Sequence, residues 1–313
     1  MRGKMQWTKE DLTVGCCKTV LGEICFDSLG ITLPHEHICC YSEYAYKMAG
    51  AAYLDKEVLA HAAISHLKAI KAAHGLSTFV DCTPVNIGRD PELLKRVSEQ
   101  SGVNIVCSTG FYHTDEVVLH ATSEDTLCSY MVADAKSVNA GIIKCAVEEK
   151  EMSPFDEKLL RASAKAHLQL GLPVVMHTNA KNQNATWALE ILLSEGVKPN
   201  AITVGHLSDT ADVDFVAKIA SYGCFIGLDR LYGSTSEEYI SSKLAAIRTL
   251  CDAGYEDRIL LSHDDLFFNG FAKEPRINAT PRFSCCFDNI LPRLSRSLTE
   301  KLMVQNPARM LMA

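Results

Sequence analysis

The sequence lacks the features that mark several specialised classes of protein. Its 31 Lys and Arg residues are outnumbered by 38 Asp and Glu, for a net charge of −7, so the basic patch of a nucleic-acid-binding domain is not expected. No apolar run approaches the ~20 residues that a membrane span needs. The first residues have no apolar core typical of a signal peptide. We therefore expect a cytoplasmic protein with neither nucleic acid nor membrane as partner.

Disulfide and zinc-finger frameworks are also absent. The 13 cysteines are odd in number and scattered, and none forms a CxxC pair. We expect reduced thiols, most of them buried as small hydrophobic side chains. Cysteine-based catalysis is an alternative that the sequence disfavours, because no cysteine stands in a recognisable nucleophile motif with a histidine partner.

No linker or low-complexity segment divides the chain, and a strand-then-helix pattern recurs along it. Five stretches have helical spacing of apolar residues, at 56–73, 154–170, 186–194, 212–221 and 236–253. Eight short, β-branched apolar runs alternate with helix-compatible segments, at 31–33, 78–81, 104–107, 142–147, 173–176, 202–204, 224–227 and 258–261. Continuous apolar strands of this kind are typical of a parallel sheet that is covered on both faces.

Eight strand–helix units favour a closed barrel over an open sheet. An open doubly wound sheet usually carries a glycine-rich phosphate turn after an early strand, whereas the first run here ends in Pro34-His35-Glu36-His37. The sequence predicts an α/β protein, a single-domain (β/α)₈ TIM barrel over residues 1–313, with residues 1–18 as an N-terminal extension.

Six residues with metal-binding side chains fall at the carboxyl ends of the predicted strands, where barrel enzymes place their active sites. Each has an ordinary explanation when taken alone: a strand-end histidine is usually structural, a lysine usually lies at the surface, and an aspartate often caps a helix. Together at one rim they favour a metal centre, since imidazole and carboxylate suit zinc, iron, cobalt and manganese. The six are His35, His37, Lys144, His177, His206 and Asp264.

The lysine of this set requires a chemical explanation. Two cations need an anionic bridge, and an ammonium group would repel both. Lys144 contributes only if it has lost its proton and gained carbon dioxide, because the resulting carbamate offers two oxygens. Of the remaining histidines, His113 and His263 lie near the rim and stay ambiguous. Those within helical stretches are predicted to be structural, at positions 61, 66, 74, 120 and 167.

Seven ordered motifs resemble the phosphotriesterase family of the amidohydrolase superfamily, over residues 19–312. The pieces HTNA, GHLSDT, IGLDR and SHD are most similar to the phosphotriesterase-like lactonases. The motifs are TLPHEH (32–37), IIKCAVEE (142–149), VVMHTNA (174–180), TVGHLSDT (203–210), FIGLDRLYG (225–233), ILLSHDD (259–265) and NPARML (306–311).

The resemblance implies two divalent cations, zinc foremost, with cobalt, manganese or iron also compatible with the ligands. His35 and His37 match the ligands of the more buried metal, and His177 and His206 those of the more exposed one. Carbamylated Lys144 and a hydroxide are implied as the bridges between the metals. A homodimer is implied as well.

Three residues match catalytic positions of the family. Asp264 matches the aspartate that binds the buried metal and shuttles the proton. Tyr112 matches a lactonase tyrosine beside the metals, and Arg230 an active-site arginine of the lactonase branch. The function implied is opening of lactone rings by the bridging hydroxide, with promiscuous phosphotriesterase activity. A phosphotriesterase or carboxylesterase acting on another ester is the alternative, and a non-catalytic metal-binding barrel is the alternative of another class.

The sequence departs from the family after the metal-binding aspartate. Asp265 stands where the family often has Trp or Tyr, and the loop at 266–282 has no close motif match. That region is expected to line the substrate pocket, where an acidic residue would disfavour an anionic substrate.

Overall fold

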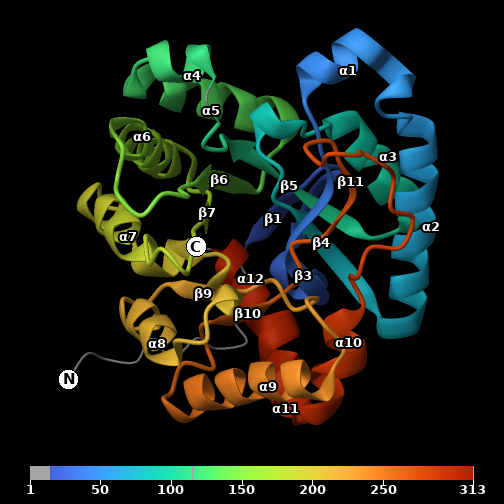
Figure 1. The fold of residues 1–313 in the computed structure, drawn as a ribbon, viewed down its shortest axis with the longest axis vertical. Coiled ribbons are helices and arrows are strands. Elements are labelled where there is room, and N and C mark those ends of the chain that lie inside the picture. The colour runs from blue at the N-terminus through green and yellow to red at the C-terminus, as the bar shows by residue number, and fades with distance from the viewer. Residues whose placement is uncertain (1–14, 115, 313) are drawn as a thin grey trace.

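The centre of the molecule is a parallel sheet curled into a barrel, which confirms the predicted fold (Figure 1). The structure is a computed structural model that describes residues 15–114 and 116–312. The sheet runs in the order β10-β9-β8-β7-β6-β5-β4-β3-β11. Its eight barrel strands are β3 (Ile31–Cys40), β4 (Leu76–Asp81), β5 (Asn104–Gly110), β6 (Ile142–Ala146), β7 (Val174–His177), β8 (Ile202–Val204), β9 (Phe225–Leu228) and β10 (Ile259–Leu261).

The barrel closes where the chain leaves β10. The backbone N–H of Asp264 donates to the carbonyl of His35, and that of His37 donates to the carbonyl of Asp265, both at 3.1 Å. The next strand, β11 (Leu266–Asn269), then pairs in parallel with the far half of β3. β3 therefore continues to Cys40, beyond the predicted end at residue 33, and β11 lies within the loop for which no motif was found.

Helices surround the barrel on its outside (Figure 1). The five predicted helices are present, with ends within one residue of those expected: α2 (Lys56–His74), α6 (Pro154–Leu170), α7 (Ala185–Ser194), α8 (Val213–Ser221) and α9 (Glu237–Asp252). The others are α1 (Glu43–Ala49), α3 (Pro91–Ser101), α4 (Val117–Ala121), α5 (Glu124–Val138), α10 (Cys285–Asn289), α11 (Arg296–Glu300) and α12 (Asn306–Leu311).

Short elements complete the chain. A hairpin of β1 (Cys16–Thr19) and β2 (Gly22–Cys25) precedes the barrel, and its turn residue Val20 donates a backbone hydrogen bond to Ile105 on β5. The predicted extension at 1–18 thus includes the start of this hairpin, while residues 1–14 lie outside the described part. The single-turn pieces are η2 (Phe26–Ser28), η3 (Gly50–Ala52), η4 (Val85–Ile87), η5 (Pro199–Ala201), η6 (Leu207–Asp209), η7 (Leu291–Arg293) and the π-helical η8 (Lys301–Gln305).

Two apolar layers hold the barrel in shape. Adjacent strand residues face opposite sides of a sheet, so Phe79 packs in the layer under the helices while Val80 packs in the second layer. That second layer joins residues of several strands, among them Val106, Ile142 and Val175. Among the described residues, no helix is long and apolar enough to cross a membrane.

Candidate metal centre

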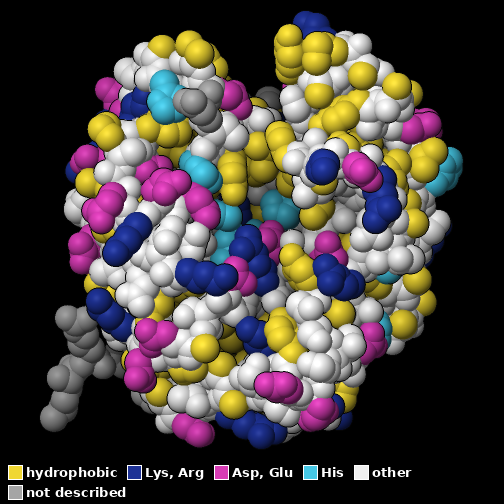
Figure 2. Space-filling view, viewed as in Figure 1, with side chains coloured by type: hydrophobic (Ala, Val, Ile, Leu, Met, Phe, Trp, Pro, Cys, Tyr) yellow, Lys and Arg dark blue, Asp and Glu magenta, His cyan; other side chains and the backbone are white. Residues whose placement is uncertain are grey.

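The structure brings the six predicted side chains together at the carboxyl end of the barrel, and Figure 2 shows a hollow on that face with histidines at its base. The Nζ of Lys144 lies 2.7 Å from Nε2 of His35. The Nε2 of His206 lies 2.7 Å from Nδ1 of His177. The Nε2 of His37 lies 3.1 Å from Oδ1 of Asp264. All of them except Asp264 are less than a tenth exposed, and its side chain is 13% exposed.

The alternation of β3 explains why two of these histidines share a face. His35 and His37 are two residues apart on a strand, so both point inward. Glu36, between them, is fully buried and accepts hydrogen bonds from the Ser262 hydroxyl at 2.7 Å and from the backbone of His263 at 2.9 Å. This carboxylate fastens β3 to the end of β10, close to where Asp264 leaves the strand.

Two of the six residues adopt a backbone conformation that side chains other than glycine seldom take. His206 has φ of 64° and Asp264 has φ of 54°. Left-handed conformations at such residues cost of order 1–3 kcal/mol and are concentrated at functional sites. Both residues follow directly or closely on short buried strands, so the turn aims each side chain back over the barrel mouth.

Asp229 is a buried residue of this site that the sequence interpretation missed. It follows β9, and its Oδ2 accepts from Nδ1 of His35 at 2.6 Å. Its Oδ1 accepts from the backbone N–H of His206 at 2.7 Å and from Nδ1 of the same residue at 3.1 Å. The signal was available, because Asp229 stands two residues after the predicted strand at 224–227. A carboxylate that holds the outer nitrogen of an imidazole fixes which nitrogen faces a metal.

Glu148 was missed in the same way. It follows β6, and its Oε2 lies 2.8 Å from Nε2 of His177. Asn179 donates to its other oxygen at 2.6 Å. The hydrogen bond from His177 lowers the pKa of Glu148 to about 2, so this carboxylate is charged. The fourth imidazole, His37, has its Nδ1 2.8 Å from the hydroxyl of Thr83.

Each of the four imidazoles thus has one nitrogen engaged by an outer partner and the other turned toward the centre. With Nδ1–H of His206 donating to Asp229 and Nε2–H of His177 donating to Glu148, the two nitrogens that face each other at 2.7 Å are both lone-pair acceptors. Two acceptors at that distance repel each other unless a proton or a metal ion lies between them. Burial and then Lys144 lower the pKa of His35 to about 3, which keeps this imidazole neutral. Neutral imidazole is the form that binds metals.

Ligand atoms of these residues fall into three groups in which all atoms lie within 4.8 Å of one another. The first is His35, His37 and Asp264, which is the predicted set for one cation. The second contains Asp229, whose oxygens already accept from imidazole N–H groups. The third is His113, Glu148 and His177, which places the ambiguous His113 beside the site.

The other ambiguous histidine, His263, is structural. Its Nδ1 contacts Glu36 at 2.7 Å, and its Nε2 accepts from the backbone of Cys286 at 3.1 Å. Two histidines predicted to be structural likewise bond to the backbone: Nε2 of His66 contacts Pro281, and Nδ1 of His167 contacts Leu172.

Arg230 holds the carboxylate of Asp264 in place. Its Nε donates to Oδ2 of Asp264 at 2.8 Å, and its Nη1 donates to Asp209 at 2.6 Å. Burial alone would raise the pKa of Asp264, but His206, His37 and His35 hold that pKa well below the ordinary value. Asp264 is therefore ionised and oriented.

A cavity of about 420 Å³ opens beside these residues. Tyr112 lines it, with its hydroxyl 3.4 Å from Nε2 of His177. Burial, with Glu148 adding to it, raises the pKa of Tyr112, so its hydroxyl is neutral. Apolar side chains also line the cavity, among them Pro84, Ile87, Leu266 and Phe271.

The structure corrects the expectation for Asp265. This residue does not line the cavity, whereas Leu266, Asn269 and Phe271 of the following loop do. Its carboxylate is turned toward Arg282, whose backbone N–H donates to Oδ2 at 2.8 Å. Asp265 is only 7% exposed and ties the two ends of the loop together, so its charge does not select among substrates.

Comparison with known proteins identifies the family of the chain. The phosphotriesterase family profile matches residues 15–311. The chain belongs to the phosphotriesterase family. Its barrel superposes on the solved phosphotriesterase of Mycobacterium tuberculosis with a TM-score of 0.83 at 25% identity, covering 95% of this chain and 98% of that one.

Among the relatives of this phosphotriesterase-family protein is an aryldialkylphosphatase of Saccharolobus solfataricus, 31% identical over 86% of this chain and 89% of its own length. The phosphotriesterase homology protein of Mycobacterium tuberculosis is 28% identical over 93% and 96%. The N-acetyltaurine hydrolase of Homo sapiens is 28% identical over 95% and 98%. The prediction of a hydrolase is confirmed, and the alternative of a non-catalytic barrel is not supported.

Proposed function

We propose that this protein is a lactonase that works with two divalent cations. The observation that carries the proposal is the neutral Tyr112 hydroxyl, which lies beside His177 in a cavity that apolar side chains also line. A cyclic ester matches this arrangement, because its carbonyl side is polar and its ring and substituent are apolar. Its substrate is then a small neutral lactone.

The donor set fits the proposed cations. Four imidazoles present their inward nitrogens together with a carboxylate, and the outer nitrogens are fixed. When bound, divalent metals acidify water and polarise a carbonyl oxygen. We assign His35, His37 and Asp264 to one cation and His177 and His206 to the other, with zinc foremost and cobalt, manganese or iron compatible.

Carbamylation of Lys144 is part of the proposal. The side chain is 2% exposed, and in the described residues no carboxylate lies within 4.0 Å of its Nζ. A buried ammonium without a counter-ion is costly, and here its nearest partner is an imidazole nitrogen. Reaction with carbon dioxide would replace this positive charge by an anion whose two oxygens would be able to bind both cations.

The protein's own residues supply the proton transfer and the orientation. Asp264, ionised and turned by Arg230, accepts the proton of the attacking water and returns it to the leaving oxygen. Tyr112 donates its hydroxyl to the ring ester, which orients the carbonyl beside His177. The leaving oxygen of a lactone stays tethered, so the product is a hydroxy acid.

The test compares kcat/KM of metal-loaded enzyme for an acyl-homoserine lactone, a simple γ- or δ-lactone, an aryl phosphotriester and N-acetyltaurine. A lactone should be preferred by orders of magnitude. Tyr112→Phe should lower kcat/KM for the lactone roughly tenfold, the loss of one hydrogen bond. Tyr232→Phe is the matched control, which should leave kcat/KM for the lactone nearly unchanged. Tyr232 lines the same cavity, but its hydroxyl forms no hydrogen bond with His177.

A phosphotriesterase is the second candidate, favoured by the aryldialkylphosphatase relative. Preference for the phosphotriester, or full lactone activity in Tyr112→Phe, would overturn the lactonase proposal and leave the metal centre intact. An anionic amide is less suited, because the guanidinium of Arg230 already pairs with Asp209 and Asp264. The other cation among the described lining residues, Lys144, would become an anion on carbamylation. The homodimer and the cytoplasmic location remain predictions.

A further inference from the structure

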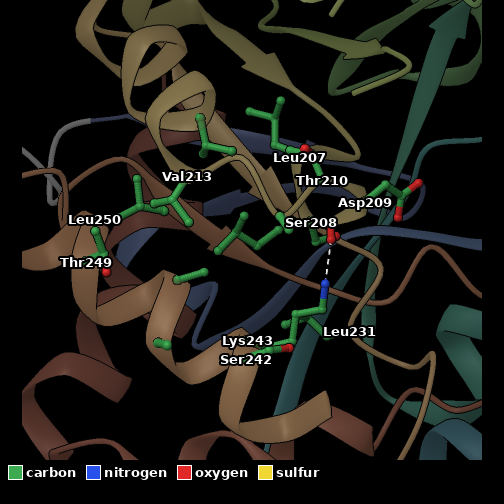
Figure 3. A pocket seen from close by; sticks show the side chains of 15 residues that line it. Leu207, Ser208, Asp209, Thr210, Val213, Leu231, Ser242, Lys243, Thr249 and Leu250 are labelled. Carbon is green, nitrogen blue, oxygen red and sulfur yellow. Dashed lines mark hydrogen bonds between the residues drawn. The ribbon is translucent and has the colours of Figure 1, made fainter. Parts of the chain in front are cut away.

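The structure has a second cavity, of about 460 Å³ (Figure 3). It is enclosed by η6, α8 and α9, and it shares no lining residue with the cavity that Tyr112 lines. Ala211 and Ala245 border it and are exposed, so it is open to solvent. Its volume falls within the range of roughly 300–1,000 Å³ that is typical of small-molecule sites.

Most of the lining is apolar. The aliphatic side chains come from four different elements or their ends: Leu207, Val213, Val216, Leu228, Leu231 and Leu250. A cavity with such walls favours a hydrocarbon segment of a ligand, because removal of apolar surface from water is favourable.

One cation stands at the polar side of this cavity. The Nζ of Lys243 donates to the carbonyl of Ser208 at 2.6 Å (Figure 3). An ammonium has three donors, and in the described residues no carboxylate lies within 4.0 Å of this one. The ring of Tyr239 lies 5.1 Å away. Burial lowers the pKa of Lys243, and Asp209 opposes this shift.

The other charged residue of the lining does not compete for this role. Asp209 is already paired with Arg230 at 2.6 Å. The cavity therefore combines an apolar interior with one cation that lacks an acidic partner.

We propose that this cavity binds a monocarboxylate with an apolar chain, its carboxylate on Lys243 and its chain among the aliphatic walls. Two sources share this chemistry, a free fatty acid and a hydroxy acid of the kind that lactone opening releases. Binding to this cavity is measured without turnover. A failure of the proposed lactonase function would therefore leave this proposal standing.

The test is calorimetric titration of the metal-loaded enzyme with octanoate and, in a separate arm, with 4-hydroxyoctanoate. Lys243→Met keeps the chain length but removes the charge, and it should weaken binding by roughly tenfold or more, as expected for a charge-assisted hydrogen bond. Lys218→Met is the matched control, because Lys218 is exposed on α8 and does not line the cavity. Octan-1-ol, which lacks the anion, should bind at least tenfold more weakly than octanoate.

A second variant tests the proposal independently in case Lys243→Met does not fold. Ala246→Phe places a ring in the cavity and should abolish binding, while circular dichroism and the melting temperature report whether the fold is kept. Tighter binding of octanoate would identify a fatty-acid site, and tighter binding of 4-hydroxyoctanoate a product site; both support the proposal. It is overturned if the wild-type protein binds neither, or if folded Lys243→Met and Ala246→Phe bind as the wild-type protein does.

Discussion

Replacing Asp229 by asparagine tests the hydrogen bonds that hold the outer nitrogens of the metal-binding imidazoles. The side chain keeps its shape but exchanges one acceptor oxygen for an amide donor. In the wild-type protein, Nδ1 of His35 donates to Asp229 at 2.6 Å. In the variant, if the remaining oxygen stays on the two N–H groups of His206, the new amide group faces this Nδ1. His35 can accept from the amide only by moving its proton to Nε2, the nitrogen that faces Lys144. The inward lone pair is then lost.

The size of the effect follows from this change of tautomer. Loss of an outer carboxylate partner typically costs 10–100-fold in metal affinity or activity, or about 1.4–2.7 kcal/mol. We expect the affinity for the cation of His35, His37 and Asp264 to fall by that factor, and kcat/KM to fall with it. The fold should survive, because asparagine fills the same volume.

Metal content after dialysis against a metal buffer, chelator competition and kcat/KM measure this prediction. Asp134→Asn is the control: Asp134 accepts from Arg89 at 2.6 Å and from Thr109 at 2.6 Å, yet touches no candidate ligand. It should cost stability but leave metal affinity unchanged. Asp229→Asn with the metal content and turnover of the wild-type protein would refute the reasoning.

Three further changes test other parts of the site. Asp264→Asn should reduce kcat by roughly 10²–10⁴-fold, because it removes the base and weakens a ligand; a variant with wild-type turnover would contradict this role. Lys144→Met should purify folded with less metal per chain, as elemental analysis would show, and full occupancy would argue against a bridge. Gly110→Ala should unfold at clearly lower denaturant than Gly254→Ala. Both glycines have positive φ, but only at Gly110 would the new Cβ lie 2.0 Å from a backbone atom, the carbonyl oxygen of Lys144.

The barrel was predictable because its signal is periodic and repeated. Short apolar runs and amphipathic helices recur along the chain, and no single misread element changes the fold. Seven of the described helices were nonetheless missed, and the two longest of them are α3 and α5, although Asp90 and Ser123 cap their first turns. Apolar residues at helical spacing were present in both, at Leu93 and Val97 of α3 and at Leu127 and Met131 of α5, and they were overlooked.

The site was predictable in its inner residues and not in its outer ones. His35 and His37 stand out in a motif, whereas Asp229 was passed over beside Arg230 although it follows a predicted strand. The end of β3 was placed too early because Pro34 and polar residues resemble a loop. The strand continues because β11 pairs with its far half, a contact between segments more than 200 residues apart. The role of Asp265 could not be predicted from the sequence, because its partner Arg282 is brought to it only by the folded loop.

The shared carboxylate of Asp229 also bears on how such a centre can be redesigned or can diverge. It holds one imidazole from each half of the site, so loss of the whole side chain at the end of β9, unlike the asparagine exchange, disturbs both halves at once. The outer partners of His37 and His177 are separate, a hydroxyl on one side of the barrel and Glu148 on the other. An engineer who wants to alter the metal preference of one half alone should therefore begin at Thr83 or Glu148 and leave Asp229 as it is.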